Sequence, residues 1–159
     1  MKRLFFIIIT FLVLLGCKQD KDELTVRAEN FFKKENVSFD RDCERALIIP
    51  GGGCPGCIAS GLSFVVDNKE LFSNWQNKNV VIFTGIGSRK ILRRHLGKAT
   101  IESLNAIVDS SNVYRVDFEA GEYPMVVYLN AGEIKKVESQ TPESSALDNL
   151  KQKLYELFF

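Results

Sequence analysis

The sequence predicts one α/β domain, a three-layer sandwich with a central mixed sheet. The chain has 159 residues, of which 45% are hydrophobic and 26% charged, a composition typical of one ordinary globular domain. Apolar runs typical of buried strands alternate with segments of helical spacing, and a hairpin and a helix come last. This order calls for right-handed crossovers and for central strands covered on both faces.

The first half of the domain is expected to contain three elements. Residues 24–36 carry apolar side chains among charges, which is compatible with a short amphipathic helix or with an irregular segment. Residues 45–50 form an apolar run bounded by a proline and three glycines, so they are predicted to be a buried strand. A helix is expected to begin near Pro55, a residue whose fixed φ suits a first helical position.

A buried strand, two helices and a half-exposed strand are expected next. The strand covers residues 79–84, and Ser88 is placed to cap a helix that ends at Gly97. Residues 100–108 have helical spacing. Residues 114–118 alternate between aromatic or aliphatic and charged side chains, which is typical of a half-exposed strand.

A hairpin and a helix complete the domain. Residues 125–129 are expected to turn through residues 130–132 into a second strand over residues 133–137. Thr141 as the cap and Pro142 at the first helical position predict the start of the last helix. Its leucines form one stripe, which indicates packing against the core.

Composition excludes several classes of function. A formal net charge of +1 lacks the strongly basic footprint of a nucleic-acid-binding protein, so no nucleic acid partner is expected. A mean hydropathy of −0.04 excludes a polytopic membrane protein. The segment Gly85-Ile86-Gly87-Ser88 follows a predicted strand, but Lys90 stands where a nucleotide loop would have its third glycine. We therefore expect neither nucleotide binding nor another cofactor.

The amino terminus has the order of an export signal. Lys2 and Arg3 precede twelve mostly apolar residues, 4–15. As a helix these twelve residues would span only about 18 Å, whereas the hydrocarbon layer is roughly 30 Å thick. Residues 1–16 are therefore predicted to be a signal peptide and not a membrane-spanning anchor.

The run Leu14-Leu15-Gly16-Cys17 resembles the lipobox of bacterial lipoproteins. The resemblance implies cleavage before Cys17, lipid on its thiol, and a protein anchored in the bacterial cell envelope, at the periplasmic face or the cell surface. An uncleaved apolar leader with a chance cysteine is the alternative. Residues 17–23 are expected to form a flexible tether, and residues 24–159 the domain.

The motif Cys54-Pro55-Gly56-Cys57 lies between the first buried strand and the helix that follows it. In this context it resembles the active-site turn of thioredoxin-like thiol–disulfide oxidoreductases, particularly their exported, membrane-tethered branch. The resemblance covers roughly residues 44–158. It implies a thioredoxin-like sandwich that exchanges disulfides with a protein client.

Helix physics assigns different roles to the two thiols of the motif. Cys54 at the helix amino terminus faces free backbone N–H groups and the positive end of the helix dipole, which lower a thiol pKa below its free value of about 8.5. Cys57, one helical turn further on, is close enough to attack a mixed disulfide on Cys54. Cys54 is therefore expected to be the nucleophile and Cys57 the resolving thiol.

Tyr123-Pro124 lies just before the first strand of the predicted hairpin. In thioredoxin-like proteins a cis-proline opens this strand beside the dithiol, and the backbone before it pairs with the bound client. The resemblance implies that Pro124 takes this position. Tyr123, Pro124, Pro55 and Gly56 are accordingly expected to form the partner-binding surface.

The motif departs from thioredoxin itself in three ways. Its proline and glycine are in the reverse order, Gly53 stands where a tryptophan precedes the motif, and Ile48 stands where an acid is buried six residues earlier. Without that carboxylate, proton transfer from the second thiol needs another group or water. Glu119 and Glu122 are the candidates that could approach through the loop before the hairpin.

Two further readings concern the remaining cysteines. Cys43 is expected either as a buried small hydrophobe or as a third redox partner. Cys43, Cys54, Cys57 and His95 could in principle form a tetrahedral zinc or copper site, but only one pair has ligand spacing and no metal is expected.

The sequence thus predicts an extracytoplasmic thiol–disulfide oxidoreductase, expected as a monomer, that acts on a protein client through Cys54 and Cys57. The direction of electron flow stays open, because it depends on the donor. The alternative is a non-catalytic surface lipoprotein that uses the same fold as a binding module and holds a structural disulfide.

Overall fold

The computed structural model describes residues 21–74 and 78–156. The predicted signal peptide, Cys17 and the first part of the tether lie outside these residues. The helices are α2 (Glu23–Lys34), α3 (Pro55–Asp67), α4 (Lys69–Asn74), α5 (Arg89–Leu96), α6 (Lys98–Ser103), the 3₁₀ helix η1 (Glu119–Glu122) and α7 (Ala146–Tyr155). The strands are β1 (Arg45–Pro50), β2 (Asn79–Thr84), β3 (Ala106–Asp109), β4 (Met125–Asn130) and β5 (Glu133–Ser139).

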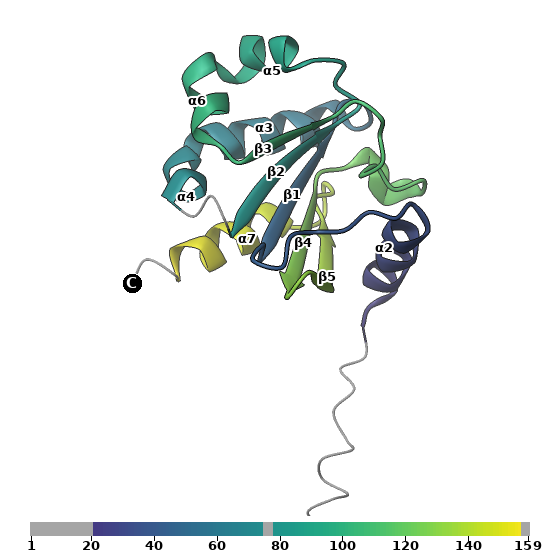
Figure 1. Ribbon diagram of the computed structural model, residues 1–159. Helices are drawn as coiled ribbons and strands as arrows, with labels where there is room; N and C mark the ends of the chain where they lie inside the picture. Colours follow the sequence, from purple (N-terminus) through teal and green to yellow (C-terminus); the bar gives the residue numbers. More distant parts are fainter. Residues whose placement is uncertain (1–20, 75–77, 157–159) are drawn as a thin grey trace, which may run out of the picture.

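The five strands form one mixed sheet in the order β3-β2-β1-β4-β5 (Figure 1). Strands β1, β2 and β3 are parallel, while β4 is antiparallel to both β1 and β5. The parallel strands β2 and β3 lie on one side of β1, and the hairpin of β4 and β5 lies on the other side. The final helix, α7, follows the hairpin in the chain. The predicted α/β fold, a three-layer sandwich with a central mixed sheet, is confirmed.

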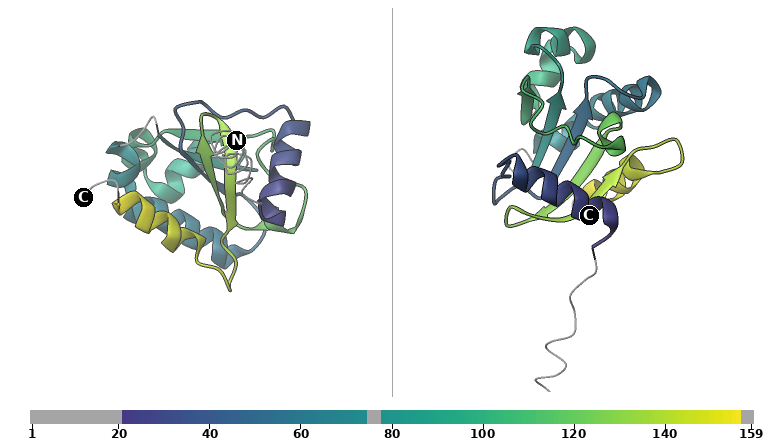
Figure 2. Two further views of the ribbon diagram at one scale, coloured as in Figure 1. Left: turned by 90° about the horizontal axis from the view of Figure 1, so that it is seen from below. Right: turned by 90° about the vertical axis from the view of Figure 1, so that its right-hand side faces the viewer.

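Strand β1 is the centre of the sheet and separates two hydrophobic cores. Leu47 and Ile49 point to the core that α3, α4, α5, α6 and α7 cover. Ala46 and Ile48 point to the opposite core, which α2 and the segment before β4 cover. Because side chains alternate along a strand, a strand buried on both faces is apolar at nearly every position. Figure 2 shows α2 and α7 on opposite sides of the sheet.

Helix α2 confirms the helical reading of residues 24–36 and begins inside the stretch expected to be a tether. Asp22 caps it, since its carboxylate accepts a hydrogen bond from the backbone N–H of Thr25 at 2.8 Å. The Thr25 hydroxyl in turn accepts from the backbone N–H of Val137 in β5 at 2.8 Å. Ala28 and Phe32 on the same helix are buried against the sheet. These contacts fix α2 on one face of the domain.

The single helix predicted over residues 100–108 is wrong. Helix α6 ends at Ser103, and the following residues form β3, in which Ile107 pairs with Ile82 and Val108 with Phe83 of β2. β-branched residues favour an edge strand when a partner strand is available, and this tertiary pairing overrides helical spacing.

The half-exposed strand predicted over residues 114–118 is also wrong, because this segment is a loop. The buried carboxylate of Asp109 accepts hydrogen bonds from the backbone N–H groups of Ser111 at 3.2 Å and Tyr114 at 2.9 Å, which turns the chain away from the sheet. Val116 is nevertheless buried in the core under α2. The apolar residues of this segment alternate with charged ones because they pack against that core, although the segment is not a strand.

The last helix starts later than the sequence predicts. Residues 141–144 form a turn in which the Ser144 hydroxyl accepts from the backbone N–H of Thr141 at 2.7 Å. The side chain of Gln140 then accepts a hydrogen bond from the backbone N–H of Leu147 at 3.0 Å, in the first turn of α7. The expected leucine stripe is buried at Leu147, Leu150 and Leu154. None of the helices formed by residues 21–74 and 78–156 has the length and apolar character to cross a membrane.

Candidate functional site

The dithiol motif lies where β1 ends and α3 begins. Cys54 is the N-cap residue of α3, with extended backbone (φ −67°, ψ 107°), and Pro55 is at the first helical position. The Cys54 sulfur accepts a hydrogen bond from the backbone N–H of Cys57 at 3.4 Å. Proline suits this position because its ring presets a helical φ and its missing N–H would have no partner in the helix. The local sequence therefore positions one thiol on the helix amino terminus.

The two thiols differ in their access to solvent. Their sulfur atoms lie 2.6 Å apart and both cysteines are free. Cys54 is half-buried, whereas Cys57 lies under the first turn of α3 with 8% of its surface exposed. Pro55 and Gly56 between them are exposed. A reacting partner can thus reach Cys54 from solvent, while Cys57 is accessible to Cys54.

The surroundings of Cys54 favour its thiolate. The pKa of Cys54 is lowered from its ordinary value, first by a hydrogen bond from the thiol of Cys57 and then by the backbone N–H groups of Cys57 and Gly56. The negative charge of Glu122 opposes this effect. Hydrogen bonds to the charged form of a group stabilise that form. Cys54 is therefore the better nucleophile of the two.

Cys57 is held as a neutral thiol. Its hydrogen bond to Cys54 raises the pKa of Cys57 to about 11, together with burial and the negative charges of Cys54 and Glu143. One proton is in effect shared by the pair, and it stays on Cys57. Deprotonation of Cys57 therefore needs a group that accepts this proton.

We expect the two thiols to be alkylated at different pH. Iodoacetamide reacts with thiolates, so Cys54 should be modified with a midpoint below its ordinary pKa, and Cys57 only as the pH approaches about 11. Peptide mapping by mass spectrometry after timed alkylation at each pH measures both profiles. In Cys57→Ala the midpoint of Cys54 should move upward, because its strongest hydrogen-bond donor is gone. Coincident profiles for the two cysteines would contradict this asymmetry.

The chain before β4 packs directly against the dithiol turn. The backbone N–H of Cys54 donates to the carbonyl oxygen of Glu122 at 3.0 Å. Gly53 has a φ of +132°, and a Cβ atom placed on it would lie 2.3 Å from the same oxygen. Only glycine combines this backbone conformation with so close an approach. Gly53 thus allows η1 and the dithiol turn to meet.

Pro124 lies beneath the dithiol helix. It is buried just before β4, and a Cβ atom on Gly61 of α3 would lie 3.1 Å from its Cγ atom. No peptide bond among the described residues is cis, so the bond before Pro124 is trans and the implied cis-proline is wrong. The carbonyl of Pro124 accepts from the backbone N–H of Gln140 at 2.8 Å, which ties this turn to the end of β5.

Tyr123 lies beside the thiols and is half-buried. Its partial burial, followed by the charges of Cys54 and Cys57, raises the pKa of Tyr123. Of the four residues expected to contact a partner, Tyr123, Pro55 and Gly56 have surface available, whereas Pro124 is buried.

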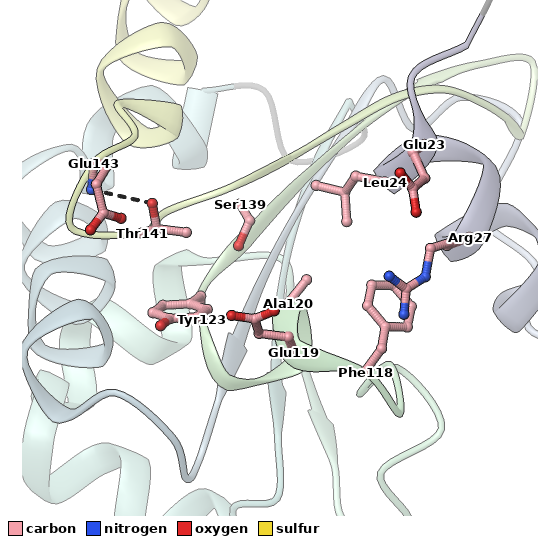
Figure 3. A pocket seen from close by; sticks show the side chains of 10 residues that line it. All are labelled: Glu23, Leu24, Arg27, Phe118, Glu119, Ala120, Tyr123, Ser139, Thr141 and Glu143. Carbon is pink, nitrogen blue, oxygen red and sulfur yellow. Dashed lines mark hydrogen bonds between the residues drawn. The ribbon is translucent and has the colours of Figure 1, made fainter.

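A pocket of about 470 Å³ opens next to Tyr123 (Figure 3). It lies between α2, the segment around η1 and the turn that follows β5. Its lining residues are Glu23, Leu24, Arg27, Phe118, Glu119, Ala120, Tyr123, Ser139, Thr141 and Glu143. Through Tyr123 and Glu143 the pocket adjoins the dithiol.

The carboxylates near the thiols come from loops and not from β1. Ile48, six residues before Cys54, contributes no carboxylate and is buried in the core under α2. Of the two candidates named from the sequence, Glu122 acts on Cys54 through its charge, and Glu119 lines the pocket. Glu143 was missed, although its charge acts on Cys57. The available signal was its place just after β5, which runs antiparallel to β4 and ends level with the start of that strand.

Cys43 is separate from the dithiol. It precedes β1 while Cys54 follows β1, and six extended residues span about 20 Å. Its buried sulfur donates to the carbonyl of Arg45 at 3.3 Å, and burial raises the pKa of Cys43. The prediction that Cys43 is a small buried hydrophobe is confirmed, and the prediction that it is a third redox partner is wrong.

Among the described side chains no three from His, Cys, Asp and Glu are grouped to hold a metal ion. His95 is exposed in the last turn of α5.

Comparison with known proteins gives structural similarities. No protein family and no curated protein matches the sequence. The fold is similar to the exposed lipoprotein thioredoxin of Streptococcus pneumoniae, with a TM-score of 0.47 and 13% identity over 73% of this chain and 87% of that one. It is also similar to a Neisseria meningitidis protein assigned to the thioredoxins, with a TM-score of 0.45 and 18% identity over 71% of this chain and 75% of that one.

Proposed function

We propose that this protein is a thiol–disulfide oxidoreductase that acts on a protein client through Cys54 and Cys57. The observation that carries the proposal is the asymmetry of the pair at the start of α3. Cys54 is accessible and its pKa is lowered, whereas Cys57 is buried and its pKa is raised. A structural disulfide needs neither an accessible sulfur nor a stabilised thiolate, so this asymmetry favours exchange over the non-catalytic alternative.

The proposed reaction is a two-electron exchange in two steps. The Cys54 thiolate attacks one sulfur of the client disulfide, and the other client sulfur leaves as a thiolate. Cys57 then loses its proton and attacks the Cys54 sulfur, so that the first client sulfur leaves in turn. The client gains two electrons and, after protonation of its thiolates, two protons. The protein ends with a Cys54–Cys57 disulfide.

The direction of the reaction depends on the partner that restores the dithiol. An external dithiol donor would keep the protein reduced and make it a reductase of client disulfides. If instead an external disulfide oxidant restores the Cys54–Cys57 disulfide, the oxidised protein would transfer it to client thiols by the same steps in reverse. We further propose that the exchange occurs in the bacterial cell envelope, with the domain held there by lipid on Cys17. The export-signal order of residues 1–16 and the lipobox-like run that ends at Cys17 support this location.

The test is to trap the mixed disulfide between protein and client. Cys57→Ser can complete the first step but cannot release the client, so it should accumulate a covalent adduct with a protein disulfide such as insulin. Non-reducing electrophoresis and intact mass spectrometry detect the adduct, which dithiothreitol should dissolve. Cys54→Ser is the matched control and should form no adduct. If Cys57→Ser forms none either, and the wild-type protein does not reduce insulin, the proposed activity is wrong.

A further inference from the structure

The pocket beside Tyr123 has a mostly acidic lining. Glu23, Glu119 and Glu143 contribute three carboxylates to its lining, against one guanidinium from Arg27. None of the three carboxylates forms an ion pair with another described residue. Glu122, the residue before Tyr123, contributes a fourth carboxylate. Its negative charge acts on the Cys54 thiol.

The one cation of the pocket lies away from the thiols. The Arg27 guanidinium lies over the ring of Phe118, 4.3 Å from its centroid. Figure 3 shows this pair on the α2 side, whereas Glu119, Tyr123 and Glu143 gather on the opposite side. The end of the pocket that adjoins the dithiol is therefore negative.

The lining also offers apolar surface. Leu24, Ala120 and the ring of Tyr123 provide apolar contacts between the charged groups. A long side chain with an aliphatic stem and a cationic end matches both this apolar surface and the carboxylates around it.

We infer that this pocket selects clients in which a lysine or arginine lies next to the reacting cysteine. This inference rests on the proposed function, because it assigns a substrate class to the same dithiol. When the client sulfur meets Cys54, its neighbouring basic side chain enters the pocket past Tyr123 and its charge meets Glu119 and Glu143. The carboxylates raise the rate of productive encounter, and the aliphatic stem covers the apolar part of the lining.

The test compares two synthetic peptide disulfides. The peptides are identical except that the residue beside the single cysteine is lysine in one and glutamate in the other, and each is oxidised to its homodimer. The pre-reduced protein is mixed with either peptide, and quenched alkylation with mass spectrometry gives the reduction rate. Each rate is divided by the rate of the same peptide with dithiothreitol, because a neighbouring charge also changes the reactivity of the peptide sulfur itself.

The lysine peptide should react about tenfold faster than the glutamate peptide at low ionic strength, and added salt should reduce this preference, since exposed charges are screened. In the double variant Glu119→Gln/Glu143→Gln the preference should fall to about twofold or less. The matched control, Glu35→Gln/Glu133→Gln, removes two exposed carboxylates outside the pocket and should keep the tenfold preference.

The outcomes separate the two proposals. Equal normalised rates for the two peptides, or a preference that survives in Glu119→Gln/Glu143→Gln, would overturn the client selection while leaving the exchange activity in place. If the protein reduces neither peptide nor insulin, the proposed function itself fails. The salt dependence of the wild-type preference gives an independent reading if the double variant does not fold.

Discussion

Cys54→Ser is expected to abolish disulfide exchange, with a fall in insulin reduction of at least about a thousandfold. The reason is that Cys54 is the thiol that combines access from solvent with a lowered pKa. A serine hydroxyl at this position could still cap α3, so the fold should persist. Turbidity or fluorescence assays of insulin reduction, with a far-ultraviolet circular dichroism spectrum of the variant, measure both effects.

Cys43→Ala is the matched control for this prediction. Cys43 is buried before β1, at the end of the strand away from the dithiol. Its replacement should leave the rate of insulin reduction within about twofold of the wild-type rate, because the sulfur takes no part in exchange. Full activity in Cys54→Ser would contradict the assignment of the chemistry to Cys54. Loss of activity in Cys43→Ala, with the fold intact, would contradict it as well.

Gly53→Ala is expected to lower the free energy of unfolding by about 3 kcal/mol and to disrupt the dithiol turn. Alanine is strained at a φ of +132°, and its Cβ atom would lie 2.3 Å from the carbonyl oxygen of Glu122. The chain must then move apart, which breaks the 3.0 Å hydrogen bond from the Cys54 backbone to that oxygen. Urea denaturation measures the stability, and the rate of insulin reduction measures the site.

The neighbouring glycine provides the control for Gly53→Ala. A Cβ atom on Gly52 would meet nothing within 4 Å, and its φ lies outside the range that side chains rarely adopt. Gly52→Ala should therefore change the free energy of unfolding by no more than about 0.5 kcal/mol. Equal losses in the two variants would mean that the loop needs flexibility in general and not the close approach at Gly53.

Elements with a strong local pattern could be predicted from the sequence. The apolar run of β1 and Pro55 after it specified a buried strand followed by a helix, as found. Strand β2, helix α5 with its end at Gly97, and the hairpin of β4 and β5 were likewise predicted at nearly their observed bounds. In each case burial on one or both faces, or a residue with restricted backbone freedom, leaves a signal within a few neighbouring positions.

Elements that depend on a distant partner were missed. β3 exists because β2 offers it an edge, so Ile107 and Val108 pair there instead of continuing a helix. The segment 114–118 alternates like a strand, yet it joins no strand of the sheet, and only Val116 is deeply buried. Such choices are made by the arrangement of the sheet and not by propensity.

What the sequence by itself determined is the pair of thiols at a helix start and their unequal surroundings, since the N-cap position of Cys54 and the turn that buries Cys57 follow from four consecutive residues. What only the tertiary structure decided is which carboxylates lie near the two thiols. Glu122 and Glu143 are far from the motif in the chain and reach it because β4 begins and β5 ends at the edge of the sheet where β1 ends. Contacts within one helical turn are set by covalent connection, whereas contacts between loops are set by strand order and register.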